Sequence, residues 1–397
     1  MARNRVIYQS EALFISPNST GYHFSGDDSA GIKKGSSVMG IGGTHARDSG
    51  NLVSQLSRVQ SANYSFTINR TDINEFGRLA RIDALITESP TVSLDFTYYP
   101  IDGKNEHLLK FVVDGQTNCI KNHLNDNIGS NFFIETTAEG TDVAGNVDKD
   151  STKTTIGLGN GFLSDYTFDA SVGSIPTASV TVEGFNMKAD QGTTGNSIPA
   201  VTLEDGEPIA GVEYSLPSGN TGDHTLAALR PGDLKLHFPA DSALVTNTSG
   251  EDAGTAAHVQ SVSFNIPMSR TPIERLGSVF PYVRVPDVPL NASFTINALV
   301  ADIGSGNLAT LIDNEKSHEL KVTMKDPKED KETMSDKIKG ALLDSESFSS
   351  DIGGNKTVDL TFSTQVGGPE DTINGVFISG CYDTNSLPDY SDIAGGD

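Results

Sequence analysis

Tryptophan is absent from this chain of 397 residues, and cysteine occurs only twice, at Cys119 and Cys381. The two cysteines do not occupy corresponding positions in the repeat described below. A disulfide framework is therefore excluded, and a reducing assembly compartment is compatible with the chain. No apolar run approaches the length of about 18 residues that a membrane-spanning helix needs, so no span is expected. The opening stretch, MARNRVIYQSEALF, lacks the apolar segment of a secretory signal.

Basic residues are scarce, with 28 Lys and Arg against 52 Asp and Glu, which gives a formal net charge of −24. This balance argues against a protein that grips nucleic acid, because neutralising phosphates requires clustered Lys and Arg. The acidity can serve solubility and repulsion between free subunits. It can also give a surface past which a polyanion must move without binding. Composition alone leaves both interpretations open.

The sequence lacks the motifs of common enzymes. It contains no GxSxG, HExxH, paired CxxC or Walker loop, and its eight histidines show no metal-ligand spacing. Two acidic stretches, Asn125–Asn127 and Asp142–Asp150, do not fit a calcium loop and are interpreted as solvated loops. We therefore predict no catalytic, cofactor-binding or metal-binding residues. A glycan hydrolase would need two converging carboxylates, which 52 acidic residues do not exclude.

One sequence pattern occurs twice. Residues 59–77 (VQSANYSFTINRTDINEFG) and 259–277 (VQSVSFNIPMSRTPIERLG) share seven identities without a gap, where about one is expected by chance. A second match relates 165–173 (DYTFDASVG) to 359–367 (DLTFSTQVG). The same order of landmarks predicts two copies of one domain. We place the first copy, with its connector, at 1–205 and the second at 206–397.

The residue pattern of both copies is that of β structure. Residues 62–69 alternate polar and apolar side chains, so Tyr64, Phe66 and Ile68 should share one face of a strand. Short helices are expected at 105–113 and 307–313, a helical turn at 72–79, and a surface helix or a loop at 326–340. The predicted fold is mainly β, with two tandem β-sandwich or partly closed barrel domains, each flanked by a short helix. Further strands are expected at 6–15, 91–99, 131–137, 178–185, 233–238, 263–269, 292–299, 319–324, 358–366 and 375–380.

Residues retained in both copies are candidates for structural or interface roles. An Arg that directly follows a strand suits a bidentate pair with a carboxylate on a neighbouring domain, or an ion pair within its own domain. The glycines suit positive φ angles or close backbone approach. These candidates are Arg70, Thr71, Gly77, Gly173, Arg270, Thr271, Gly277 and Gly367.

The stretch Ser171–Asn186 (SVGSIPTASVTVEGFN) resembles the C-terminal strand region of tailed-bacteriophage major tail tube proteins. In that family a strand ends at Val-Gly, a turn carries Pro-Thr-Ala/Ser, and a further strand runs through Glu-Gly/Ala-aromatic-Asn. The strands that precede Arg70-Thr71 and Arg270-Thr271 are similar to the family's ring-lining strands. The second copy departs from the pattern, because Gly367-Gly-Pro-Glu-Asp stands where the first has Ile-Pro-Thr-Ala.

This resemblance implies a structural virion protein without cofactors. Three chains, each with two tube domains, would form a pseudo-hexameric ring that stacks helically into a hollow phage tail tube. Three chains at −24 each give −72 per ring, so genomic DNA would pass through the lumen without specific binding. The implied partners are other copies of the chain and further tail proteins at the tube ends. The implied location is the virion, after assembly in the host cytoplasm. A capsid decoration protein, tail-spike segment or adhesin-type β-sandwich remains the alternative.

Overall fold

The computed structural model describes residues 11–16, 53–126, 129–137, 143, 153–192, 199, 201, 203–204, 207–208, 228–237, 259–281, 283–299, 317–329, 331–349 and 357–382. This part of the chain is mainly antiparallel β structure, which confirms the predicted fold class. Its helical segments are short: α1 (Lys104–Leu108), α2 (Lys121–Asn125) and a 3-10 turn (Pro231–Asp233). None of the described helices is long and apolar enough to span a membrane.

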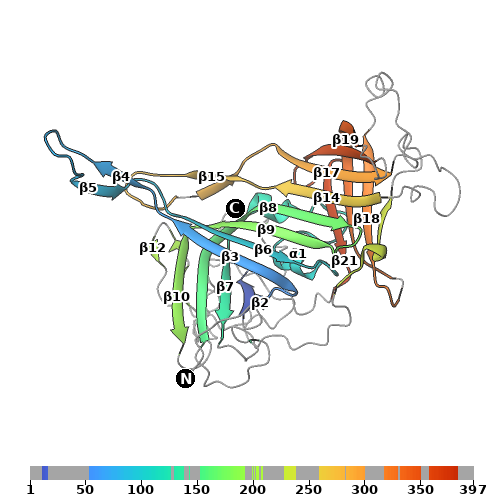
Figure 1. Ribbon diagram of the computed structural model, residues 1–397, viewed down its shortest axis with the longest axis horizontal. Coiled ribbons are helices and arrows are strands. Elements are labelled where there is room, and N and C mark those ends of the chain that lie inside the picture. The colour runs from blue at the N-terminus through green and yellow to red at the C-terminus, as the bar shows by residue number, and fades with distance from the viewer. Residues whose placement is uncertain are drawn as a thin grey trace, which may run out of the picture.

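Eight antiparallel strands, four from each copy, form one continuous layer that we call the central sheet. In Figure 1, β8 of the first copy lies beside β14 of the second, and this pair joins the two halves. The order is β3 (Val59–Thr67), β6 (Thr91–Tyr98), β9 (Thr177–Gly184), β8 (Lys153–Ser171), β14 (Val259–Pro267), β17 (Leu290–Leu299), β20 (Thr357–Val366) and β19 (Glu332–Ser349).

Two long strands, β8 and β19, leave the central sheet and continue into a second layer. The first half of β8 pairs with β7 (Ser130–Thr136) and β10 (Asn186–Gly192). The first half of β19 pairs with β18 (His318–Lys325) and β21 (Gly375–Gly380). The remaining strands are β1 (Glu11–Ser16), β2 (Ser54–Gln55), β4 (Arg70–Ile73), β5 (Asp83–Ile86), β11 (Leu203–Glu204), β12 (Glu207–Pro208), β13 (Leu234–His237), β15 (Arg270–Ile273) and β16 (Val283–Pro286).

The strand registers confirm the internal duplication residue by residue. Ser61 lies opposite Thr97, and Ser261 lies opposite Asn297, so both strands of this pair repeat after 200 residues. A β-bulge interrupts the register at the same place in both copies, directly before these two serines. Nine strands have counterparts: β1 with β13, β3 with β14, β4 with β15, β5 with β16, β6 with β17, β7 with β18, β8 with β19, β9 with β20 and β10 with β21.

The second sequence match, of 165–173 with 359–367, does not relate equivalent strands and is wrong. Residues 165–169 belong to β8, whose counterpart β19 lies 180 residues later, whereas 359–366 belong to β20, the counterpart of β9. The bulge in β8 between Leu163 and Asp165 recurs in β19 between Leu343 and Ser345. The match arose because every strand of this sheet alternates polar residues with core residues, so strands at different positions resemble one another.

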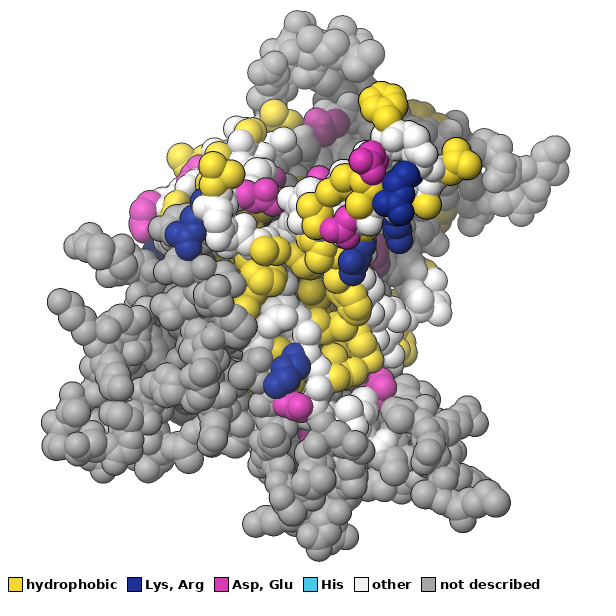
Figure 2. Space-filling model, turned by 90° about the vertical axis from the view of Figure 1, so that its left-hand side faces the viewer, with side chains coloured by type: hydrophobic (Ala, Val, Ile, Leu, Met, Phe, Trp, Pro, Cys, Tyr) yellow, Lys and Arg dark blue, Asp and Glu magenta, His cyan; other side chains and the backbone are white. Residues whose placement is uncertain are grey.

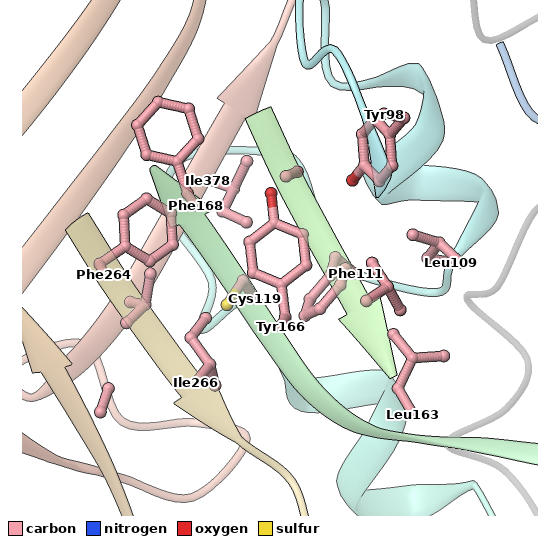
Figure 3. Close-up of a cluster of buried hydrophobic side chains, with 14 of the residues drawn as sticks. Tyr98, Leu109, Phe111, Cys119, Leu163, Tyr166, Phe168, Phe264, Ile266 and Ile378 are labelled. Carbon is pink, nitrogen blue, oxygen red and sulfur yellow. The ribbon is translucent and has the colours of Figure 1, made fainter. Parts of the chain in front are cut away.

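The largest cluster of buried hydrophobic residues contains side chains of both copies. Tyr166 and Phe168 from β8 pack against Phe264 from β14, and the rings of Phe168 and Phe264 stack with centroids 5.2 Å apart (Figure 3). The segment after α1 also crosses between the copies, because the amide of Cys119 donates to the carbonyl of Val376 in β21. The boundary near residue 205 therefore separates two sequence repeats that share a hydrophobic core in the folded chain. That it is also a boundary between domains stays a prediction.

Several local predictions were wrong, and others lie outside the described residues. Residues 72–79 contain the end of β4 and the loop that leads towards β5 and are not helical, while 327–329 form a turn and 332–340 belong to β19. In each case the strand pairing of β4 with β5 and of β18 with β19 overrides the local helical preference. The predicted helix at 105–113 is confirmed only as the shorter α1. The predicted helix at 307–313 and the acidic stretch at 142–150, apart from Val143, lie outside the described residues.

Candidate functional site

The central sheet has one apolar face and one polar face. The apolar face packs on the second layer, where Phe96 of the central sheet contacts Phe132 of β7 with ring centroids 6.2 Å apart. The other face, which we call the polar face, consists mostly of Ser, Thr, Asn and Asp. Phe162 also lies on this side of the sheet, opposite Glu183, but it is buried and the guanidinium of Arg270 lies over its ring, so it is not counted as a member of the polar face. Its members are Ser61, Asn63, Ser65, Thr67, Thr91, Ser93, Asp95, Thr97, Asp165, Thr167, Asp169, Ser171, Thr177, Ser179, Thr181, Glu183, Ser261, Ser263, Asn265, Pro267, Asn291, Ser293, Thr295, Asn297, Leu299, Leu342, Ser345, Ser347, Ser349, Thr357, Asp359, Thr361, Ser363 and Gln365.

Hydrogen bonds between neighbouring strands connect these short polar side chains. Asn265 donates to Asp165 (2.7 Å) and to Thr167 (2.8 Å), which links the two copies across the β8–β14 junction. The hydroxyl of Thr181 donates to Asp95 over 2.8 Å. Short side chains held by such bonds have few rotamers to lose, so the polar face presents a defined surface.

No member of the polar face is Lys or Arg. Its five charged members, Asp95, Asp165, Asp169, Glu183 and Asp359, are all acidic. One of them, Glu183, accepts from Arg284 of the β15–β16 hairpin at 2.8 Å. The side chain of Arg284 is only 4% exposed, so a polyanion approaching this face would meet mainly hydroxyls and carboxylates. Sequence reasoning did not name these residues because the face of each strand depends on its register.

Two hairpins, which we call arm 1 (residues 70–86) and arm 2 (residues 270–286), project from the ends of β3 and β14 (Figure 1). Both carry large apolar side chains in solvent. Phe76 and Leu79 at the tip of arm 1, and Leu276 at the tip of arm 2, are fully exposed. Figure 2, viewed from the arm side, shows hydrophobic side chains gathered along this end of the molecule. Apolar groups in this number on a projecting element mark an interaction surface.

The bases of the two arms differ. Arg270 of arm 2 is buried and donates to backbone carbonyls of the first copy, to that of Asp126 at 2.8 Å and to that of His123. Its guanidinium also lies over the ring of Phe162, 4.6 Å from the centroid. The acceptors of Arg270 are thus backbone carbonyls, and not the carboxylate expected from the sequence. Arg70, at the same place in arm 1, is exposed.

The other retained residues have local roles. Thr71 shares a hydrogen bond of 3.0 Å with Thr87, and Thr271 donates to Asp287 over 2.6 Å, so both Thr side chains bond next to their arms. Gly77, Gly173 and Gly277 have φ angles of 86°, 90° and 91°, as expected of glycines in turns. Gly367 instead allows close approach, because a Cβ there would lie 2.1 Å from Oδ2 of Asp371.

Two carboxyl groups are buried where the copies meet. Glu106 of α1 accepts hydrogen bonds from the hydroxyls of Tyr98 (2.8 Å) and Tyr166 (3.3 Å). Burial raises the pKa of Glu106 to about 7. Asp336 of β19 is fully buried without a hydrogen-bond partner for either oxygen, and burial, reinforced by the charge of Glu106, raises its pKa well above the usual value. Both groups are closed off from solvent, so this pair gives a substrate no access.

Within the stretch 125–127, which was predicted as a solvated loop, Asp126 is buried in an ion pair, Asn125 is exposed, and Asn127 lies outside the described residues. Lys110 donates to Asp126 and to the carbonyl of Gly129, and the side chains of the pair are 2% and 6% exposed. Asp126 is thus held by Lys110 beside the carbonyl that Arg270 binds, which ties arm 2 to the helical flank of the first copy. Among the described residues no cluster of His, Cys, Asp or Glu could hold a metal ion.

Comparisons with known proteins leave the family open. No protein-family model matches the chain, and no curated protein is similar to it. Among solved structures, it is similar to a chain in the cryo-EM structure of the anti-feeding prophage (AFP) baseplate, with 11% identity, 37% of this chain and 92% of the other covered, and a TM-score of 0.24. It is also similar to a crystal structure of Hcp protein, with 10% identity, coverages of 37% and 97%, and a TM-score of 0.21. Likeness at these scores carries no argument about this chain.

Proposed function

We propose that this chain is the structural subunit of a bacteriophage tail tube. Three chains form a pseudo-hexameric ring, and rings stack helically into a conduit through which genomic DNA passes. The observation that carries this proposal is the polar face, which runs across eight strands and both copies with acidic residues and no Lys or Arg. The second layer covers the opposite face, so the polar face is the one available to line a channel.

A channel for DNA must not retain it. Duplex DNA carries one charge for about every 1.7 Å of its axis, and each phosphate contact by a cation adds affinity. A wall of hydroxyls, amides and carboxylates makes no such contacts and repels the phosphates. The proposed tube ends at further tail proteins, acts in the virion, and is assembled in the host cytoplasm. It needs neither a cofactor nor a catalytic residue.

Negative-stain electron microscopy of the concentrated and then diluted protein tests this function. We expect rings or tubes with a central channel and about six lobes, as three chains with two copies each require. A helical reconstruction should then place the polar face on the channel wall. Persistently monomeric two-lobed particles would instead favour a decoration or adhesin module. A channel lined by the other layer would contradict the conduit.

The arms provide the contacts between stacked rings in this proposal. Replacing Phe76 and Leu79 together with Ser should leave rings intact but prevent their stacking, because each side chain loses roughly 2 kcal/mol of burial and each ring presents several arms. Electron microscopy and sedimentation would separate rings from tubes. Ile373→Ser is the matched control, since Ile373 is also exposed (72%) but lies off the arms. Tubes of normal length from the arm variant would disprove this role.

A further inference from the structure

Within the chain, the first copy joins the second through the antiparallel pairing of β8 with β14, which shows how two copies can pair edge to edge. The two strands are antiparallel, with Ser261 opposite Ser171 and Pro267 opposite Asp165. On the core side, Phe264 and Ile266 of β14 are 1% and 0% exposed. On the other side, the polar face runs through the junction without a break.

The same two strand types recur at the outer ends of the central sheet. β3 is the counterpart of β14, and β19 is the counterpart of β8. Among the described residues, β6 is the only strand that pairs with β3, and residues 342–349 of β19 pair with β20. The edge of β3 that corresponds to the junction therefore has no strand beside it in the described part of the chain.

The exposed side chains of β3 indicate that a strand is missing there. Tyr64 and Phe66 occupy the positions of Phe264 and Ile266, yet they are 39% and 56% exposed. Polar and apolar residues alternate in β3 as they do in strands that bury one face in a core. On one side β3 pairs with β6, and on its other side no described strand lies next to it. An open edge with exposed aromatic residues is a template for pairing with another chain.

We propose that β3 of one chain pairs with β19 of a second copy of this chain, in the register of the β8–β14 junction. Subtracting 200 from the residue numbers of β14 and adding 180 to those of β8 transfers the register from the observed β14–β8 pair to the new β3–β19 pair. This inference rests on the proposed tube, since the pairing repeated three times closes the ring. The opposed residues are Asn63 and Ser349, Tyr64 and Phe348, Ser65 and Ser347, Phe66 and Glu346, and Thr67 and Ser345.

The register matches polar with polar or apolar with apolar residues at four of the five opposed pairs, and the fifth sets Phe66 opposite Glu346. Tyr64 would meet Phe348 as Phe264 meets Phe168 within the chain, which covers the exposed apolar side chains of β3. Ser65 would meet Ser347, both of which are exposed members of the polar face, so the channel wall would continue from chain to chain. Shifting the register by one residue would place aromatic side chains on the polar face.

A disulfide experiment tests the register in the full chain. In a Cys381→Ser background, which removes the exposed native thiol, Ser65→Cys is combined with Ser347→Cys and the protein is oxidised mildly. The expected product on a non-reducing gel is a covalent trimer. The matched control combines Ser65→Cys with Ser349→Cys, on the same face but displaced by two residues. Opposed Cβ atoms fit disulfide geometry and diagonal ones do not, so about tenfold more trimer is expected from the first pair.

The outcomes separate this inference from the proposed function. If rings form while the first pair stays uncrosslinked, or if the control pair crosslinks better, the register is wrong although the tube remains. If the first pair crosslinks into ladders longer than three chains and electron microscopy shows no rings, the edge pairing is right and the tube is wrong. Monomers under all conditions, without rings, would overturn both.

Discussion

Replacing Arg270 with Ala is expected to lower the free energy of unfolding by about 3 kcal/mol, because the change removes a buried donor that makes hydrogen bonds to three backbone carbonyls. Arg270 is 8% exposed and donates to the carbonyls of His123, Asp126 and Arg284. The substitution also removes the cation from the face of Phe162. Urea titration followed by circular dichroism measures the change.

The duplication supplies the matched control. Arg70→Ala removes the same side chain from the equivalent, exposed position in arm 1, so the free energy of unfolding of the single chain should change by less than about 0.5 kcal/mol. Equal effects of the two substitutions would show that the anchoring of arm 2 on the first copy contributes nothing to stability. A loss of ring formation in Arg70→Ala at unchanged stability would agree with pairing of β3 between chains.

The second large effect is on the pH dependence of stability, and it comes from Glu106. Burial raises the pKa of its carboxyl from 4.5 to about 7 in the folded chain. Between these values the folded chain binds a proton that the unfolded chain has released, so raising the pH favours unfolding. The stabilisation of the folded chain by the protonated Glu106 carboxyl is complete below pH 4.5 and is lost as the pH rises through about 7. The free energy of unfolding falls by roughly 3 kcal/mol over this range.

A neighbouring group has the opposite effect, so the comparison must be made between variants. Burial lowers the pKa of His123 to about 3, and its contribution is therefore lost as the pH falls below 6.5. Because His123 is present in both proteins, its contribution cancels when the free energy of unfolding of wild type is compared with that of Glu106→Gln at each pH. The stability advantage of wild type should shrink by roughly 3 kcal/mol between about pH 4.5 and pH 7.5. An advantage that stays constant with pH would show that Glu106 titrates normally.

Asp336 provides an independent check of the same region. Its pKa is raised by burial and by the charge of Glu106, so its contribution to stability is also present at low pH and lost as the pH rises. The charge of Glu106 disfavours ionisation of Asp336, and removing both carboxyls with Glu106→Gln and Asp336→Asn should flatten the profile more than either change alone. Because α1 carries Glu106 and β19 carries Asp336, this titration reports on the contact between the two copies.

The strands could be predicted from the sequence because polar and apolar residues alternate regularly in them. The repeat at 59–77 and 259–277 even gave the correct equivalence of β3 with β14 and of the two arms. The same alternation misled the second match, since Phe168 and Phe362 both face the core from different strands. Periodicity identifies a strand but does not give its place in the sheet.

The candidate site was harder to predict, because it depends on pairing between distant residues. The polar face emerges only when Asn265 is placed beside Asp165 and Thr181 beside Asp95. Burial was also misjudged, since the acidic stretch at 125–127 was interpreted as solvated, whereas Lys110 pairs with Asp126 in the interior. The Arg-Thr pair occurs in both copies, but its two Arg side chains differ in burial. Arg270 lies against the first copy and is buried, whereas Arg70 is exposed in the single chain.

The unequal anchoring of the arms limits how rings can be stacked. Arg284, which holds arm 2 to Glu183, has Ala84 as its counterpart in arm 1, so the two arms of a chain are not interchangeable. A ring of three chains then alternates two kinds of arm and superposes on itself after a third of a turn, not after a sixth. Each added ring can therefore sit on the ring below in three equivalent rotational positions and not in six. A ring of three chains with two fused copies each thus leaves fewer choices for the rotation between successive rings than a ring of six identical subunits would.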